Sequence, residues 1–293
     1  MTDPAAVERD AAEAASAFSH PAVAPDATAA YGEHPDHVVD FYAPRAETPG
    51  SPAPLVVVLH GGAWRAPYDR QHITPFADFL ARQGFAVANV EYRRGSSLPH
   101  QNADGPVAGR WPETFDDVAA AMDALPGLAA AALPQADVRR VVVTGHSAGG
   151  HLALWAAARH VLPYGSPWRL PSPPMLRGVV ALAPIADFAV AEELGVCGGA
   201  SAQLLGGEEH FADRLPYADP AALLPTGIAT AVVQGRDDIV VPQQVAEAYV
   251  AAAAKAGEMV GLTLLDGVGH FPLIDPAADA CAVVSEEIAQ LAW

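Results

Sequence analysis

A serine lies between two glycines at a point where a strand pattern gives way to a helix pattern. The segment reads Gly145-His146-Ser147-Ala148-Gly149, with a β-branched run over 138–144 before it and an alanine-rich run over 148–160 after it. A sharp strand-to-helix turn exposes the serine hydroxyl at the strand end, and the N-terminus of the following helix stabilises negative charge. The spacing therefore predicts that Ser147 is a nucleophile for attack on a carbonyl carbon.

A serine nucleophile needs a base, and the chain contains 11 histidines. His270 follows a predicted strand over 260–265, so it would lie on a loop at the end of the sheet. The neighbours His146 and His151 flank the serine, where a side chain in the same turn points elsewhere. Two others fall on a helix and in an irregular segment, namely His160 and His210. We therefore predict that His270 is the base.

The acid that orients the base should follow the preceding strand, predicted over 230–234. Two adjacent carboxylates, Asp237 and Asp238, occur there. We select Asp238, four residues before Pro242, and keep Asp237 as the alternative. The resulting chain order of serine, aspartate and histidine is that of the α/β-hydrolase triad, in which the acid fixes the imidazole tautomer and stabilises the imidazolium.

A glycine pair lies in the segment His60-Gly61-Gly62-Ala63-Trp64, directly after a predicted buried strand over 54–59. An ordinary Gly-Gly turn is one interpretation. The position, one strand–helix unit before the serine strand, favours a loop whose backbone N–H groups bind an oxyanion. The predicted donors are the N–H groups of Gly62, Ala63 and Ala148.

Three further residues are candidates for the substrate pocket: Trp64, His146 and Phe271. Trp64 could equally pack against the edge of the sheet. The segment Glu91-Tyr92-Arg93 favours ion pairs that support the oxyanion loop over contact with substrate.

Strand and helix patterns alternate along the chain, which is typical of a doubly wound, mostly parallel sheet flanked by helices. We predict one α/β domain over 1–293, with an N-terminal arm over 1–30 that holds a helix and a loose segment. Irregular residues 184–225 predict a small cap insertion, and 95–109 form an unusually long polar connection. Strands are predicted at 38–42, 54–59, 85–92, 138–144, 176–182, 230–234 and 260–265, and helices at 73–83, 114–125 with Thr114 as N-cap, 148–160, 243–256 and 278–292.

The chain has 293 residues, 51% of them hydrophobic, and a formal net charge of −18. This balance argues against nucleic acid and anionic membranes as partners, because both would repel such a surface. It also disfavours strongly anionic substrates, although a local arginine pocket could override the global field. A small-molecule ester or amide is the expected partner, and a homodimer is left open.

The two cysteines, Cys197 and Cys281, are expected to be free thiols, since two cysteines do not make a disulfide framework. The pair His34 and His37 lacks further ligands, so no metal site is expected, and serine chemistry needs no cofactor. Without a signal-like or membrane-spanning segment, a cytoplasmic location is expected.

Six stretches together resemble α/β-hydrolases of the esterase/lipase and kynurenine (aryl) formamidase group, over about 37–290. They are HGGAW (60–64), VEYRR (90–94), WPETFDDV (111–118), GHSAGGH (145–151), GRDDIVVP (235–242) and GVGHF (267–271). H-G-G-x-W is characteristic of the formamidases, whereas esterases similar to hormone-sensitive lipase usually carry H-G-G-G.

The resemblance implies a carboxylesterase or arylformamidase that works through an acyl-enzyme. A peptidase of the prolyl-oligopeptidase kind is disfavoured because the chain lacks a propeller domain. A non-catalytic binding member of the fold is disfavoured because all three triad residues are present.

Overall fold

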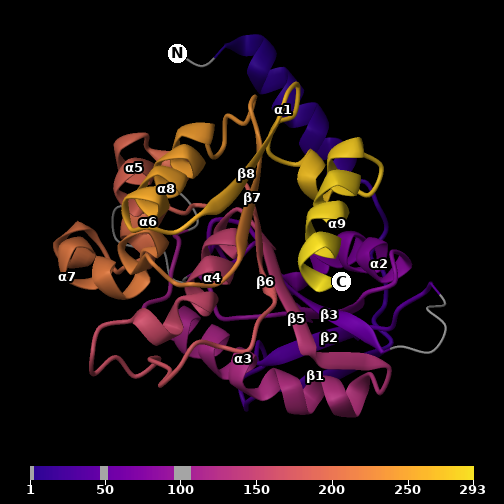
Figure 1. The fold of residues 1–293 in the computed structure, drawn as a ribbon. Helices are drawn as coiled ribbons and strands as arrows, with labels where there is room; N and C mark the ends of the chain where they lie inside the picture. The colour runs from indigo at the N-terminus through magenta and orange to yellow at the C-terminus, as the bar shows by residue number, and fades with distance from the viewer. Residues whose placement is uncertain (1–2, 47–51, 96–106) are drawn as a thin grey trace.

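The computed structural model describes residues 3–46, 52–95 and 107–293. Its described strands form one eight-stranded sheet in the order β1-β2-β4-β3-β5-β6-β7-β8 (Figure 1). The first two pairings, β1 with β2 and β2 with β4, are antiparallel, and all the others are parallel. The strands are β1 (Ala27–Ala30), β2 (Val38–Tyr42), β3 (Ala53–Leu59), β4 (Ala86–Val90), β5 (Ala136–His146), β6 (Gly178–Leu182), β7 (Thr230–Gly235) and β8 (Val260–Leu265).

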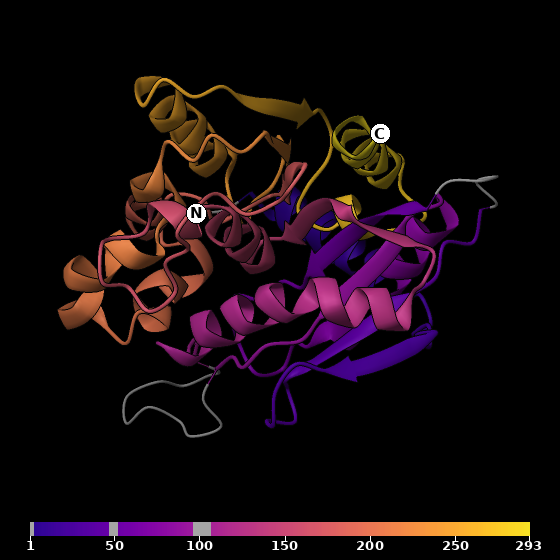
Figure 2. The ribbon, with the colours of Figure 1, turned by 60° about the horizontal axis from the view of Figure 1, so that its bottom comes forward.

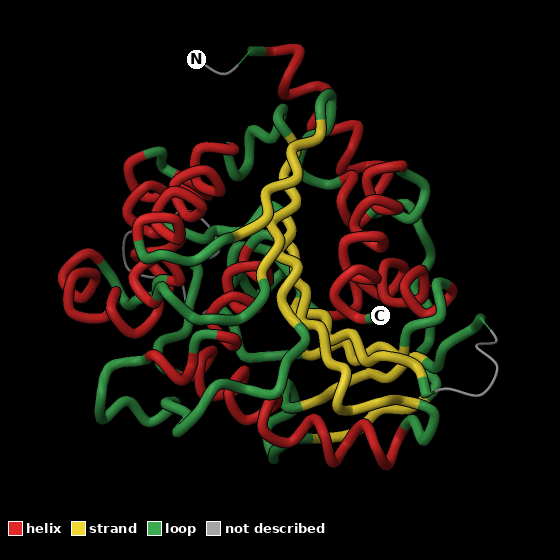
Figure 3. The backbone as a smooth tube through the Cα atoms, viewed as in Figure 1, coloured by secondary structure: helices red, strands yellow, loops and turns green. Residues whose placement is uncertain are grey.

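Helices cover both faces of this sheet (Figure 3). On one face lie α2 (Thr74–Arg82) and α9 (Asp279–Ala292); on the other lie α3 (Glu113–Ala132), α4 (Ala148–Ala157) and α8 (Gln243–Lys255) (Figure 1). Figure 2 shows α3 lying across the strands. The predicted α/β-hydrolase fold class, with a mostly parallel sheet between helices, is confirmed.

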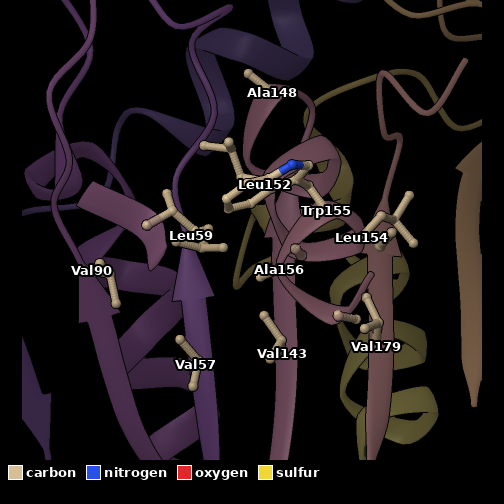
Figure 4. Close-up of a cluster of buried hydrophobic side chains, with 14 of the residues drawn as sticks. Val57, Leu59, Val90, Val143, Ala148, Leu152, Leu154, Trp155, Ala156 and Val179 are labelled. Carbon is tan, nitrogen blue, oxygen red and sulfur yellow. The ribbon is translucent and has the colours of Figure 1, made fainter. Parts of the chain in front are cut away.

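The central strand β3 shows why the sheet needs a layer of helices on each face. Leu55, Val57 and Leu59 pack into one core and Val56 and Val58 into the other, and all are fully buried. Successive side chains of a strand point to opposite faces, so a continuous apolar run requires cover on both. Figure 4 shows one of these cores, where residues of α4 lie over the strands.

The segment predicted as a cap lies between β6 and β7 and holds three short helices, α5 (Phe188–Glu193), α6 (Ala200–Leu204) and α7 (Glu208–Ala218). Two side chains of α4 bind its backbone. The His151 ring nitrogen Nε2 lies 2.9 Å from the Ala218 carbonyl, and the Trp155 indole N–H donates to the Tyr217 carbonyl at 2.9 Å. The cap segment is thereby joined to the helix that follows Ser147.

The structure departs from the predicted elements in three places. The arm 1–30 is more ordered than predicted, because α1 (Pro4–Ala17) is followed by the edge strand β1. Thr114 is not an N-cap: it lies within α3, where its hydroxyl donates to the Arg93 carbonyl. The helix also continues past 125, through Pro126.

Most of the long connection predicted over 95–109, namely 96–106, lies outside the described residues. Its two described ends meet, since the Gly95 N–H donates to the Gly109 carbonyl at 2.8 Å. Among the described helices, none combines the length and apolar character that crossing a bilayer requires.

Two glycines offer a matched test of this packing. A Cβ on Gly149 would lie 2.0 Å from the Leu59 carbonyl oxygen, whereas a Cβ on Gly127 of α3 would meet no atom within 4 Å. We expect Gly149→Ala to lower the free energy of unfolding by about 1–3 kcal/mol or more, because the backbone must move. Gly127→Ala should raise it by about 0.4–1 kcal/mol.

Urea unfolding of the two variants measures both changes. Equal effects of the two substitutions would contradict the close contact between α4 and β3.

Candidate active site

Ser147 occupies the turn between β5 and α4 in a strained backbone conformation. Its φ is 59° and its ψ is −118°, a region that non-glycine residues rarely adopt. The turn is held by the Ser147 N–H, which donates to the Leu182 carbonyl at 2.8 Å. Gly145 and Gly149 allow it, because a Cβ on Gly145 would lie 2.3 Å from the Gly149 carbonyl oxygen. This is the strand–turn–helix geometry predicted for a nucleophile elbow.

Asp238 and His270 are in direct contact. The Asp238 oxygen Oδ2 lies 2.6 Å from His270 Nδ1, and both side chains are buried. Oδ1 of the same carboxylate accepts the N–H groups of Val240 and Val241 at 2.8 Å each. A carboxylate fixed in this way keeps the proton on Nδ1 and leaves Nε2 free to accept another.

The adjacent carboxylate points elsewhere. The Asp237 side chain is 42% exposed and lies 3.8 Å from the Arg9 guanidinium. The structure thus brings Asp238, not Asp237, to the imidazole.

His146 contacts the backbone of His270. Its ring nitrogen Nε2 lies 2.9 Å from the His270 carbonyl oxygen, and the two rings are 4.3 Å apart. Burial, together with the nearby His270, lowers the pKa of His146 well below its ordinary value. His146 is therefore a neutral ring whose Nε2 donates to the backbone of His270 and is not free to accept a proton.

The three predicted oxyanion donors lie beside Ser147. Gly62 and Ala63 adopt positive φ angles of 104° and 51° and line the same pocket as the serine. Among the described residues, no hydrogen bond engages their N–H groups. Ala148 is the first residue of α4, so its N–H has no partner within the helix. A Cβ on Gly61 would lie 2.7 Å from the His146 carbonyl oxygen, which shows how closely this loop packs on the serine turn.

A buried ionic network fixes the glycine loop. His60 stacks on Tyr92 at 4.2 Å, and its Nε2 lies 2.9 Å from a Glu91 carboxylate oxygen. Glu91 also accepts from the Arg94 guanidinium at 2.8 Å and from the Arg70 N–H at 3.0 Å. Burial acts to raise the pKa of Glu91, but these partners outweigh it and lower that pKa to about 2.

The segment Glu91-Tyr92-Arg93 thus has the supporting geometry expected from the sequence. The Tyr92 hydroxyl donates to the His60 carbonyl, and Arg93 pairs with Asp117 at 2.6 Å.

Ser147, His270 and the glycine loop line a pocket of about 170 Å³. Ser147 and His270 share it, although no hydrogen bond joins the serine hydroxyl to the ring. Such contacts often form only once substrate is bound. The lining residues are Phe18, Gly62, Ala63, Arg65, Tyr68, His72, His146, Ser147, Cys197, Val240, His270, Phe271 and Ile274.

Of the three pocket candidates from the sequence, His146 and Phe271 line this cavity and Trp64 does not. Trp64 is fully buried, with its ring 5.1 Å from His151 and 5.9 Å from Phe188. It packs between α4 and the cap segment because the positive φ of Trp64 itself turns the chain at that point.

The N-terminal helix was not expected at the site, yet it contacts the loops that carry Asp238 and His270. The Glu13 carboxylate accepts the Gly269 N–H at 3.1 Å, and Arg9 donates to the Asp237 carbonyl at 2.8 Å. Burial raises the pKa of Glu13 and of Asp10. Phe18, just beyond α1, forms one wall of the pocket. No sequence motif marks these residues, because their contacts join opposite ends of the chain.

Within residues 3–46, 52–95 and 107–293, no group of three or more acidic, histidine or cysteine side chains is arranged to hold a metal ion. The pair His34 and His37 is engaged otherwise: His37 Nε2 lies 2.9 Å from Asp117, and its ring stacks on Tyr31. Cys197 and Cys281 are free thiols, as predicted.

The Glu91 network predicts a pH-dependent contribution to stability. The folded pKa lies below the ordinary 4.5, so the ionised carboxylate stabilises the fold above pH 4.5, and this is lost as the pH falls toward 2. We expect Glu91→Gln to lower the free energy of unfolding by roughly 3 kcal/mol at pH 7. The difference in the free energy of unfolding between the variant and the parent protein should be about 2 kcal/mol smaller at pH 3 than at pH 7.

Denaturant unfolding at the two pH values measures this difference. The control is Glu113→Gln, since among the residues that the structure describes Glu113 pairs only with the half-exposed Arg110. A difference for Glu91→Gln that is the same at both pH values would contradict the network.

Comparison with known proteins agrees with this fold. The BD-FAE family model matches residues 39–252, well over half of the chain, which includes Ser147 and Asp238 and ends before His270. Among solved structures, a truncated carbohydrate esterase from gut microbiota superposes with a TM-score of 0.71 at 19% identity, covering 93% of this chain and 99% of that one. Esterase B from Lactobacillus rhamnosis superposes with a TM-score of 0.72 at 19% identity, covering 97% of this chain and 90% of that one.

Curated relatives match shorter stretches. Non-reducing polyketide synthase stbA of Stachybotrys bisbyi is 34% identical over 40% of this chain and 5% of its own length. Esterase LipC of Mycobacterium tuberculosis is 30% identical over 43% of this chain and 28% of its own length. The probable isoprenylcysteine alpha-carbonyl methylesterase ICME of Oryza sativa is 24% identical over 82% and 56%. The match thus spans less than two thirds of each relative.

The extent of the family match, together with the sheet order and the two helical layers, leads to one conclusion: the chain belongs to the BD-FAE family and has the α/β-hydrolase fold.

Proposed function

We propose that this protein is a serine hydrolase that cleaves small carboxylic esters, with Ser147 as nucleophile, His270 as base and Asp238 as the orienting acid. The observation that carries the proposal is the 2.6 Å contact between Asp238 and His270 Nδ1, in a pocket that the strained Ser147 also lines. A buried carboxylate, an imidazole and a serine at a strand end are the parts that acyl transfer needs.

In the proposed reaction His270 Nε2 takes the Ser147 proton while the serine oxygen attacks the ester carbonyl carbon. The negative charge that develops on the carbonyl oxygen is bound by the N–H groups of Gly62, Ala63 and Ala148. The tetrahedral intermediate collapses, and the leaving alcohol departs with the proton from His270. Water then attacks the acyl-enzyme with the same base and releases the carboxylic acid and free Ser147.

Three observations support esters of modest size. The pocket of about 170 Å³ suits a short acyl group. LipC is named an esterase and ICME a probable methylesterase, and the solved carbohydrate esterase and Esterase B share the fold. An aryl formamide is the second candidate substrate, favoured by the segment HGGAW at 60–64.

Chemical labelling tests the proposal directly. We expect a fluorophosphonate to form one adduct on Ser147 of the folded protein and none on Ser147→Ala, because only an activated serine reacts. Intact-protein mass spectrometry measures the adduct. An unlabelled wild-type protein would overturn the hydrolase in favour of a binding member of the fold.

Rates on p-nitrophenyl acetate and N-formylkynurenine, with Ser147→Ala as the blank, then compare the two substrate classes. Turnover of the formamide but not the ester would replace the first candidate with the second.

The two adjacent aspartates provide a matched pair. We expect Asp238→Asn to lower kcat on p-nitrophenyl acetate by roughly 10³- to 10⁴-fold, because the amide no longer holds the imidazole in the productive tautomer. Asp237→Asn should change kcat little, since that exposed side chain only faces Arg9. A larger loss in Asp237→Asn than in Asp238→Asn would reverse the assignment of the acid.

A further inference from the structure

The pocket beside Ser147 has a charge opposite to that of the molecule as a whole. The chain carries 34 acidic and 16 basic side chains, yet none of the described residues that line the pocket is Asp or Glu. One lining residue, Arg65, is a permanent cation. His72 adds no charge near neutral pH, because burial lowers the pKa of this imidazole to about 4.

Arg65 also differs from most other arginines of the chain. Eleven of the fifteen arginines lie within salt-bridge distance of a described carboxylate. Arg65 has no such partner among the described residues. Its guanidinium instead binds a neutral group: one N–H donates to the Cys197 carbonyl at 2.5 Å. Its Nε is buried and makes no hydrogen bond with the described residues.

An arginine of this kind is prepared to bind an anion. A guanidinium presents five N–H donors in a planar fork that matches a carboxylate. The neutral Cys197 carbonyl uses one donor, and within the part of the chain that the structure describes no carboxylate pairs with this partly buried charge. An unpaired buried charge costs free energy that an incoming carboxylate would recover. Arg65 follows directly after the oxyanion loop, so a group bound there lies close to the reacting carbonyl.

We propose that Arg65 binds a carboxylate of the substrate, so that the preferred esters carry a free carboxylate on their acyl or alcohol part. This inference rests on the proposed ester hydrolysis and names its substrate class. Arg65 acts here as a specificity residue that contacts substrate, in addition to joining the glycine loop to the cap segment. The negative surface of the molecule does not oppose this choice, because a local cation at contact distance outweighs exposed charges that salt screens.

Matched esters test the proposal on each side of the scissile bond. The acyl arm compares mono-4-nitrophenyl glutarate with 4-nitrophenyl valerate, which have acyl chains of equal length. The alcohol arm compares 4-acetoxybenzoate with 4-tolyl acetate. For each pair the measured quantity is the ratio of kcat/KM for the anionic ester to kcat/KM for the neutral one. Comparison of variants with wild type cancels the intrinsic reactivity of each ester.

We expect Arg65→Met to lower this ratio about 10-fold or more in one of the two arms, as loss of a charge-assisted hydrogen bond implies, and that arm identifies the part that carries the carboxylate. Arg65→Lys should retain part of the preference, because the charge remains and the fork is lost. The matched control is Arg177→Met. Arg177 is exposed and directly precedes β6, at the opposite end of the strands from Ser147, and its loss changes the net charge equally.

If Arg65→Met lowers kcat/KM equally for anionic and neutral esters, the proposal is overturned. Such a result would mean that Arg65 only holds the cap segment through Cys197. An equal drop of the ratio in Arg177→Met would also overturn the proposal, because it would mean that the net charge of the whole molecule, and not contact with Arg65, sets the preference for anionic esters. If the wild type hydrolyses the neutral esters and Arg65→Met leaves the ratio unchanged in both arms, this inference alone is refuted. A wild type that hydrolyses no ester refutes the proposed function instead.

A measurement on the unmodified protein covers the case in which the Arg65 variants do not fold. Glutarate should inhibit hydrolysis of 4-nitrophenyl valerate more strongly than valerate does, because only glutarate retains a second carboxylate for Arg65. Equal inhibition by the two acids would contradict the proposal.

Discussion

The carbonyl oxygen of Leu59 lies where a side chain on Gly149 would have to be. This contact presses the first turn of α4 against the end of β3, and the remaining geometry of the pocket depends on it. It sets the distance between the glycine loop after β3 and the serine turn after β5, which carry the N–H groups of Gly62, Ala63 and Ala148. A single methyl group at this point would separate them. Close packing of the backbone therefore positions the residues of the pocket, in addition to the hydrogen bonds that they make.

Polar interactions then fix what the backbone has brought together. Glu91 holds His60 from one side, and His60 holds the Tyr92 ring and hydroxyl from the other. On the opposite side of the pocket, Asp238 is held by two backbone N–H groups and in turn holds His270. The glycine loop and the loop of His270 are thus each held by a buried carboxylate, and both oxygens of each carboxylate accept hydrogen bonds. Because buried charges without partners are costly, these networks favour a single arrangement of each loop.

Much of this was accessible from the sequence, for reasons that can be stated residue by residue. The strand β3 reads as an uninterrupted apolar run because it is covered on both faces, and Ser147 stands out because only small neighbours permit its turn. The choice between Asp237 and Asp238 needed the structure, since both follow the same strand and only the backbone direction separates them. Arg65, His72 and Phe18 line the pocket without any periodic pattern or motif. Their place depends on how loops pack, which local sequence does not encode.

The contact between α1 and the loop of His270 has a consequence for the order in which the molecule is made. Glu13 and Gly269 are separated by 256 positions along the chain. During synthesis the helix therefore leaves the ribosome long before its partner exists, and the serine turn is complete while the imidazole has still to be added. The pocket can be assembled only after Gly269 and His270 have been translated. A nascent chain that stops before His270 therefore holds Ser147 without the imidazole, so the serine turn precedes the residue that the proposed reaction needs as its base.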